Sequence, residues 1–164
     1  MKPPTFALAD DPIPERLRAA VAYIHARYQD FTAAQGFIPR PTGGNTVVTV
    51  DASGQVLTRA PKWSGNLGAD YTTALGGGTF GAGANLSWSS RVYYDFLNNF
   101  SQPSYKLTNA SVFWTPDSGA WKASLWVTNL TNEKVLQTIR PGGFSTDGFY
   151  EQPRKVGVSF EVRF

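Results

Sequence analysis

Apolar and polar residues alternate along much of the chain, and the pattern is clearest in the last eleven residues. Successive side chains of a strand point to opposite faces. The odd members here are polar or small, namely Lys155, Gly157, Ser159, Glu161 and Arg163. The even members are apolar, namely Val156, Val158, Phe160, Val162 and Phe164. A strand of this kind has one apolar face, which meets either the core of a soluble sheet or the lipid around an outer-membrane barrel.

The same period of two recurs in four earlier segments, at 63–72, 80–89, 109–114 and 121–128. This period predicts strands. The segment Arg16–Tyr28 is ambiguous, because its apolar residues fit both a helical spacing (17, 20, 21, 24, 28) and one side of a strand (17, 19, 21, 23). We interpret it as a strand, since every later segment is one.

The connections between these segments alternate in length. The short ones are Asp10–Pro14, Gly76–Gly78 and Pro116–Gly119, and the long ones are Asp30–Arg59, Asp95–Ser104 and Arg140–Pro153. In an up-and-down meander the short connections then share one end and the long ones the other, as in bacterial outer-membrane barrels. Within the first long connection we expect a hairpin of Thr46–Val50 with Gln55–Thr58 around Ala52–Gly54.

Composition narrows the function classes. The 164 residues suffice for one domain. The sequence contains no run of 18 apolar residues, so we expect no transmembrane helix. The net charge is +3, but Lys and Arg are scattered, which argues against a nucleic-acid partner. Zero Cys excludes disulfides and thiolate metal sites. His25 is the only His, and Gly76–Gly78 lacks the Lys of a phosphate-binding loop. No Ser lies in a motif that would supply the base and the third residue of a catalytic triad. We therefore expect neither enzymatic activity nor a bound metal or cofactor.

Four tryptophans lie near strand ends on the apolar side: Trp63, Trp88, Trp114 and Trp121. They could anchor the core of a soluble sandwich, or form the aromatic girdles of a membrane barrel. Together with the alternating loop lengths, they favour the membrane barrel.

Several motifs resemble the C-terminal barrel region of TonB-dependent outer-membrane receptors. They are Ala60–Trp63, Tyr105–Ala110, Trp121–Asn132 and the closing stretch from Pro153 to Phe164, with Ala22–Phe31 similar to an upstream strand. The resemblance covers essentially the whole chain, 1–164. It implies an all-β, antiparallel up-and-down meander of roughly seven strands, part of a 22-stranded transmembrane barrel with a plugged lumen.

The resemblance further implies uptake of a scarce ligand, such as an iron–siderophore complex, in the outer membrane of a Gram-negative bacterium. The implied partners are outer-membrane lipid, the barrel-assembly machinery, and the N-terminal strands and plug through which the TonB complex would act. We expect a fragment, because no signal peptide, TonB box or plug precedes these strands, and Thr5–Ala9 reads as the tail of a strand. The alternatives are a complete small outer-membrane barrel or adhesin of about eight strands, and a soluble β-sandwich binding module.

Two groups of residues are candidate sites. Aromatic residues of the long connections would contact ligand, or would pack the loops together: Tyr93, Tyr94, Phe96, Phe100, Phe144, Phe149 and Tyr150. By resemblance, Gly157, Phe160, Val162 and Phe164 form the C-terminal signal that the barrel-assembly machinery recognises.

Overall fold

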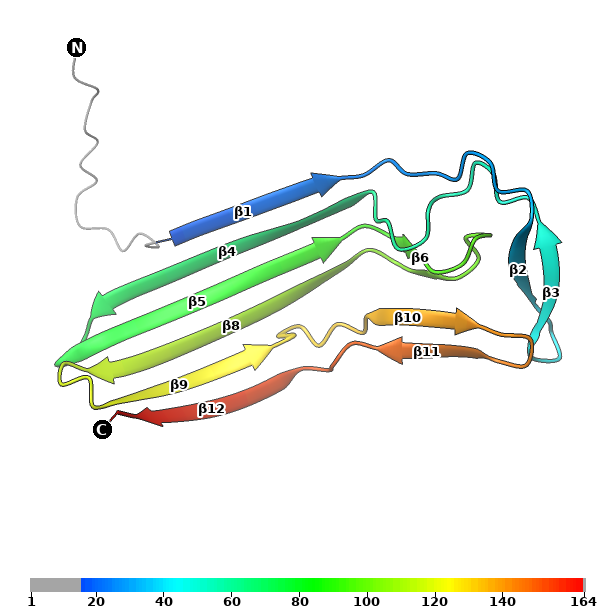
Figure 1. The fold of residues 1–164 in the computed structure, drawn as a ribbon. Coiled ribbons are helices and arrows are strands. Elements are labelled where there is room, and N and C mark those ends of the chain that lie inside the picture. Colours follow the sequence, from blue (N-terminus) through cyan, green and yellow to red (C-terminus); the bar gives the residue numbers. More distant parts are fainter. Residues whose placement is uncertain (1–15, 164) are drawn as a thin grey trace, which may run out of the picture.

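The computed structural model describes residues 16–163, and all regular structure in that range is strand. One antiparallel sheet of six strands dominates it, in the order β1-β4-β5-β8-β9-β12 (Figure 1). These strands are β1 (Arg16–Tyr23), β4 (Trp63–Ala74), β5 (Gly78–Ser89), β8 (Tyr105–Pro116), β9 (Trp121–Thr128) and β12 (Lys155–Val162). The predicted all-β meander is confirmed, and the ambiguous first segment is a strand that ends at Tyr23. The described residues include no helix of the length and hydropathy needed to cross a membrane.

Connection lengths alternate as the sequence predicts. The β4–β5 turn is a two-residue hairpin in which Gly76 and Gly77 have φ of 60° and 75°. Positive φ at both central residues matches the twist of the flanking strands, and Gly adopts it without strain. The β8–β9 turn closes with the Gly119 N–H donating to the Pro116 carbonyl at 2.8 Å. The long connections lie at the opposite end (Figure 1). The expected Asp10–Pro14 turn and Thr5–Ala9 strand lie outside the described residues.

Each long connection carries a small hairpin of its own. The pairs are β2 (Ala34–Pro39) with β3 (Asn45–Val50), β6 (Val92–Tyr93) with β7 (Ser101–Gln102), and β10 (Leu136–Pro141) with β11 (Thr146–Tyr150). The predicted hairpin of 46–50 with 55–58 is wrong, because β3 pairs with β2 instead. The turn at 52–54 does form, but Val56 then makes a single bridge to Arg27. The Asn98 side chain bonds both the N–H and the C=O of Val56, at 2.9 and 3.0 Å, and so takes the place of a partner strand.

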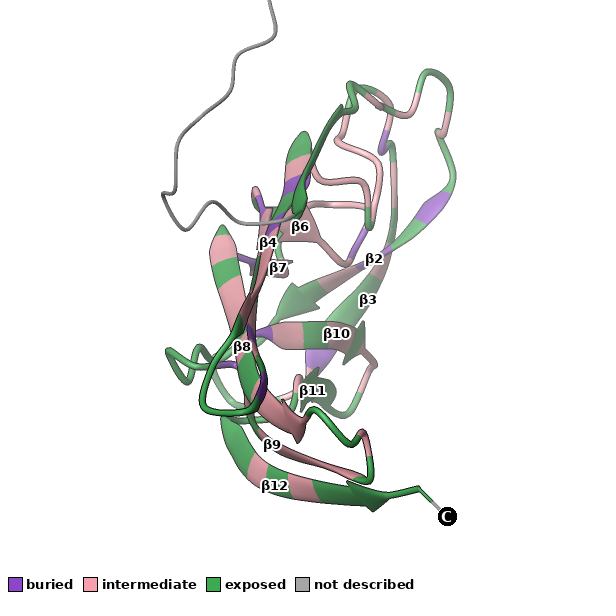
Figure 2. Ribbon diagram, turned by 90° about the vertical axis from the view of Figure 1, so that its left-hand side faces the viewer, coloured by how far each residue is buried: buried purple, intermediate pink, exposed green. Residues whose placement is uncertain are grey.

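The register divides the six-stranded sheet into two chemically distinct faces. Directly paired residues share a face, so Leu17, Ala69 and Ala84 lie together, as do Val127 and Val156. We call this side the apolar face. The opposite side, the polar face, contains the residues of alternate parity, among them Arg18, Asp70, Asn85, Asn109, Ser111, Thr128 and Lys155. Figure 2 shows the sheet curving, with the β2–β3 and β10–β11 hairpins on its concave side at the loop end.

The sheet itself lacks a hydrophobic core. The buried apolar residues of the described chain are Ala34, Ala52 and Val135, all in or beside the long connections. On the apolar face, Leu17 is 67% exposed and Val158 is 77% exposed. A soluble sandwich would cover such a face with a second sheet, and residues 16–163 provide none.

Glycines on the sheet lie opposite aromatic rings. Gly81 faces Phe113, and Gly157 faces Trp126 in the same way on the polar face. A methyl group on Gly81 would lie 2.1 Å from Phe113 Cε1, and one on Gly157 would lie 2.2 Å from Trp126 Cζ2. The rings therefore lie directly on the glycine backbone, where any larger residue would displace them.

Candidate functional site

Aromatic rings mark both ends of the apolar face. At the loop end, Tyr23 and Trp63 are in contact, with ring centroids 4.6 Å apart. At the turn end, Trp121 contacts both Trp114, at 5.1 Å, and Phe160, at 5.5 Å. The tryptophans predicted to form girdles thus lie on the apolar face near strand ends.

The spacing of the two aromatic rows suits a membrane. On β5, Phe80 belongs to the turn-end row and Trp88 to the loop-end row. Eight residue steps span about 27 Å along a strand, or roughly 20 Å across a bilayer at a tilt of about 40°. Most residues between the rows are aliphatic, such as Leu67, Leu86 and Leu125, while Tyr71 and Thr108 are exceptions. The apolar face therefore has the composition and height of a surface that contacts lipid.

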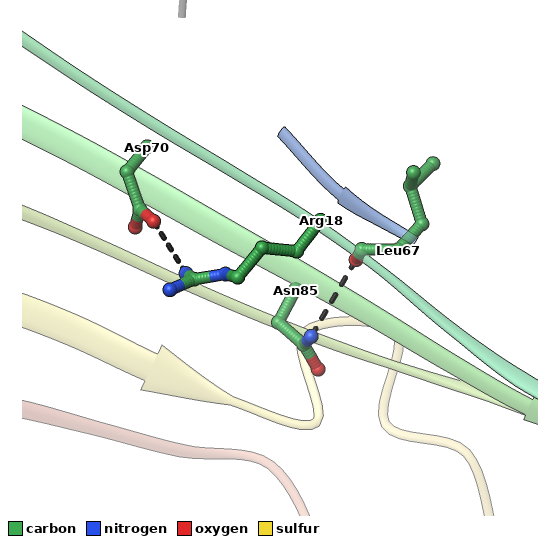
Figure 3. A network of polar contacts seen from close by, with 4 residues as sticks. All are labelled: Arg18, Leu67, Asp70 and Asn85. Carbon is green, nitrogen blue, oxygen red and sulfur yellow. Dashed lines mark hydrogen bonds and ion pairs between the residues drawn. The ribbon is translucent and has the colours of Figure 1, made fainter. Parts of the chain in front are cut away.

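The polar face carries an ion pair between Arg18 of β1 and Asp70 of β4 (Figure 3). The two side chains are 65% and 42% exposed, so solvent screens the interaction. Beside it, Asn85 Nδ2 donates to the Leu67 carbonyl at 3.5 Å, while the Leu67 side chain points away (Figure 3). A shallow hollow of about 300 Å³ follows these residues across β5, β8 and β9.

At the loop end, the first and third long connections are fastened together through Asn45. This residue is 3% exposed, and its side-chain Nδ2 donates to the Gly142 carbonyl at 2.6 Å and to Thr146 Oγ1 at 2.9 Å. Its backbone N–H donates to the Gly143 carbonyl at 2.9 Å. We call this set of contacts the Asn45 latch. It joins the β2–β3 hairpin to the turn of the β10–β11 hairpin.

The second long connection packs between the other two. Phe96 contacts Tyr28 and Phe31 of the first connection, with ring centroids 5.8 and 5.1 Å apart. The Tyr94 hydroxyl donates to the Leu136 carbonyl of the third connection, and the Leu136 N–H donates to Gln102 Oε1 at 2.7 Å. The three connections therefore form one hydrogen-bonded and packed unit.

These contacts separate the aromatic candidates of the sequence into two groups. Tyr93, Tyr94, Phe96 and Phe100 are half-buried within the loop unit. Phe149 and Tyr150 of β11 are 52% and 62% exposed, and Phe144 at the β10–β11 turn is fully exposed. Arg140 lies over the Phe149 ring at 5.5 Å. The exposed group is the one with surface free to meet a ligand.

A polar cavity of about 470 Å³ lies between the polar face and the third long connection. The sheet side consists of Ser87, Leu107, Asn109 and Thr128, and the loop side of Asn129, Gln137, Tyr150, Glu151 and Gln152. Of the aromatic candidates, only Tyr150 lines it. The alternating pattern already placed Asn109 and Thr128 on the polar side of the sheet, but no local pattern indicated that a hairpin would fold over them.

The strand-to-loop transition after β9 depends on two asparagines with positive φ. Asn129, at φ 50°, donates from Nδ2 to the carbonyls of Glu133 at 2.9 Å and Gln152 at 3.2 Å, and its Oδ1 accepts from the Glu133 N–H. Asn132, at φ 55°, accepts the Arg154 N–H at 3.0 Å. These bonds fix both ends of the third long connection at the rim of the cavity.

Three of the four residues expected to form an assembly signal, Gly157, Phe160 and Val162, lie on β12. Phe160 and Val162 are 65% and 50% exposed on the apolar face. Gly157 lies on the polar face beneath Trp126, whose Nε1 donates to Ser159 Oγ at 3.2 Å. Phe164 lies outside the described residues. Within residues 16–163, no group of three His, Cys, Asp or Glu side chains is placed to hold a metal ion.

Residues 14–130 match the family model described as TonB dependent receptor-like, beta-barrel. Three solved structures share the fold. They are the ferric yersiniabactin uptake receptor FyuA from Yersinia pestis (16% identity, TM-score 0.64), the siderophore receptor PiuA from Acinetobacter baumannii (20%, 0.64) and the ferric preacinetobactin receptor BauA from the same species (21%, 0.56). The matches cover 74%, 88% and 66% of this chain but 19%, 18% and 16% of those receptors, so the chain spans about a fifth of their length or less.

Proposed function

Because the chain belongs to the β-barrel family of TonB-dependent receptors, we propose that it forms part of the wall of an outer-membrane receptor that takes up iron–siderophore complexes. The observation that carries the proposal is the exposed apolar face between two aromatic rows, on a sheet whose other face is polar. Such a sheet is stable where lipid covers one side and a wet lumen the other. The three similar structures are receptors for iron chelates or siderophores.

The sheet edges support a larger barrel. Among the described residues, β1 pairs only with β4, and β12 only with β9. Each leaves a row of backbone N–H and C=O groups without a strand partner, which lipid cannot satisfy. We propose that further strands of the receptor pair with both edges, that a plug fills the lumen on the polar face, and that the TonB complex acts through that plug.

The test uses bacteria that carry the receptor gene containing this segment, compared with a strain in which the gene is deleted. Under iron starvation we expect the wild-type strain to accumulate ⁵⁵Fe from at least one ferric siderophore, and the deletion strain to lose that uptake. We also expect the protein in the outer-membrane fraction, extractable only with detergent. Recovery of the protein in buffer without detergent would overturn the proposal and favour a soluble binding module.

A further inference from the structure

A groove of about 460 Å³ lies on the apolar face, across β8, β9 and β12. Most of its lining side chains are aliphatic: Ala110, Val112, Leu125, Val127, Leu130 and Val156. Val127 pairs directly with Ala110 on one side and with Val156 on the other, so the groove crosses three neighbouring strands. Ala110 contributes only a methyl group, and the larger side chains around it form the walls.

The groove extends from the middle of β8 to the loop end of β12. In an outer-membrane barrel the long connections lie outside the cell, so this part of the apolar face would meet the outer leaflet. Lipid tails already surround such a face, and an acyl chain that enters the groove gains packing contacts but little hydrophobic free energy. Selection of one lipid over another would therefore depend on a polar group at the end of the groove.

Arg154 supplies that polar group. It lines the groove and directly precedes β12, and its backbone N–H donates to Asn132 Oδ1 at 3.0 Å. Within residues 16–163 the ion pair of the chain joins Arg18 and Asp70, so no acidic side chain of the described residues is paired with Arg154. A guanidinium group presents a planar set of donors that matches two oxygens of a phosphate group.

The charges on the apolar face are unevenly distributed between its two ends. Lys106 lies on this face opposite Trp88 and, together with Glu133, lines a second hollow at the loop end. With Arg154, the loop end therefore has two cations against one acid. The described apolar-face residues near the turn end are uncharged, namely Tyr71, Phe80, Trp114, Trp121, Phe160 and Val162. Basic residues at the level of the head groups attract anionic lipid.

We propose that this groove binds a phosphate-bearing lipid of the outer leaflet, with an acyl chain along Ala110 and Val127 and a phosphate group on the Arg154 guanidinium. The inference rests on the proposed location in the outer membrane and adds a partner of its own. This lipid occupies one defined site, unlike the lipid that surrounds the whole apolar face.

The head-group contact is tested by native mass spectrometry of the purified receptor that contains this segment, in an uncharged detergent. The probes are diphosphoryl lipid A and the same lipid with both phosphates removed. We expect wild type to bind the diphosphoryl form more tightly, and Arg154→Gln to weaken that binding about five- to tenfold. Lys155→Gln is the matched control, because it removes the same charge one residue away on the polar face, and it should bind like wild type.

The acyl-chain contact is tested by filling the groove. Ala110→Phe places a ring in the groove, whereas Ala69→Phe places one two strands away in the same row of the apolar face. Both alanines are half-buried, which makes them a matched pair. We expect Ala110→Phe to weaken binding of diphosphoryl lipid A about fivefold or more, because the added ring takes the space of the chain. Ala69→Phe should bind like wild type.

The outcomes separate this inference from the function on which it rests. Equal binding of the two lipids by wild type, or equal weakening by Lys155→Gln and Arg154→Gln, overturns the phosphate contact. Unchanged binding in Ala110→Phe overturns the groove as the place of the chain, and displacement of the lipid by inorganic phosphate at equal concentration would assign Arg154 to a free anion. In each of these cases ⁵⁵Fe uptake still stands. Recovery of the receptor in buffer without detergent would overturn both proposals together.

Discussion

The Gly81–Phe113 pair on the polar face gives the sharpest stability prediction. Gly81→Ala would place a methyl group 2.1 to 2.9 Å from three atoms of the Phe113 ring. Real Cβ atoms do not approach carbon so closely, so the ring must move. It would then also leave Lys122, whose ammonium lies 4.5 Å from the ring centroid.

The cost follows from those two effects. Overpacking of a fitted side chain costs about 1–3 kcal/mol, and loss of a cation–π contact at an exposed site costs about 0.5–1 kcal/mol. We therefore expect Gly81→Ala to lower the free energy of unfolding by about 2–4 kcal/mol, which is roughly a 30- to 1,000-fold change in the unfolding equilibrium.

The assay is urea unfolding of the receptor refolded in phospholipid vesicles, followed by Trp fluorescence. Gly68→Ala is the matched control, because its added methyl would meet no atom closer than Arg18 Nε at 3.5 Å, and Ala suits a strand better than Gly. In the double variant Gly81→Ala/Phe113→Ala the ring that the new methyl group would meet is gone. The loss of stability in the double variant should therefore be smaller than the sum of the losses in the two single variants, by about 1 kcal/mol or more. A free energy of unfolding for Gly81→Ala within about 0.5 kcal/mol of wild type would show that the Phe113 ring does not lie against the Gly81 backbone.

Three further predictions concern the loop end and the C-terminus. Asn129→Ala removes buried hydrogen bonds, and Ala tolerates the backbone φ of 50° less well than Asn does. We therefore expect the free energy of unfolding, measured with urea, to fall by about 2–4 kcal/mol. Burial raises the pKa of the Tyr94 phenol above its ordinary value of 10.0; its contribution to loop stability should therefore persist below pH 10 and be lost as the pH rises through the raised pKa. A tyrosinate absorbance titration should show a late component that Tyr94→Phe removes. Deletion of Phe164 should lower the amount of receptor inserted in the outer membrane, measured by heat-modifiable gel mobility.

Each of these three predictions has an outcome that would contradict it. Asn132→Ala, which loses one bond to an exposed segment, should cost less than Asn129→Ala, and equal costs would contradict the argument. A late titration step that survives in Tyr94→Phe would contradict its assignment to Tyr94. Unchanged insertion after deletion of Phe164 would remove that residue from the assembly signal.

The faces of the sheet could be predicted from sequence because they depend on a local rule. A period of two assigns Leu67 and Asn66 to opposite sides whatever their partners, and the observed register agrees. The Gly76–Gly77 turn is equally local, since only its own residues need positive φ. Such features carry their signal within a few neighbouring residues.

The loop end could not be predicted in the same way. The hairpin expected around Ala52–Gly54 failed because Asn98, 42 residues from Val56, satisfies the backbone that a strand would have paired. The Asn45 latch spans about a hundred residues in the sequence, and the Gly81–Phe113 contact joins different strands. Contacts between single polar or aromatic side chains that lie far apart in the chain produce no periodic pattern in the sequence, so the sequence alone does not predict them.

The joined loop unit has a consequence for how the proposed receptor could change its ligand. Loops that stand apart can be exchanged one at a time, by recombination or by design. Here a transplanted third connection would leave the Asn45 amide and its N–H buried without acceptors, and a transplanted second connection would leave the Val56 backbone unpaired. Each orphaned group costs about 1–3 kcal/mol. We therefore expect the three long connections to be exchanged between receptors together, in evolution or in design, and not one at a time.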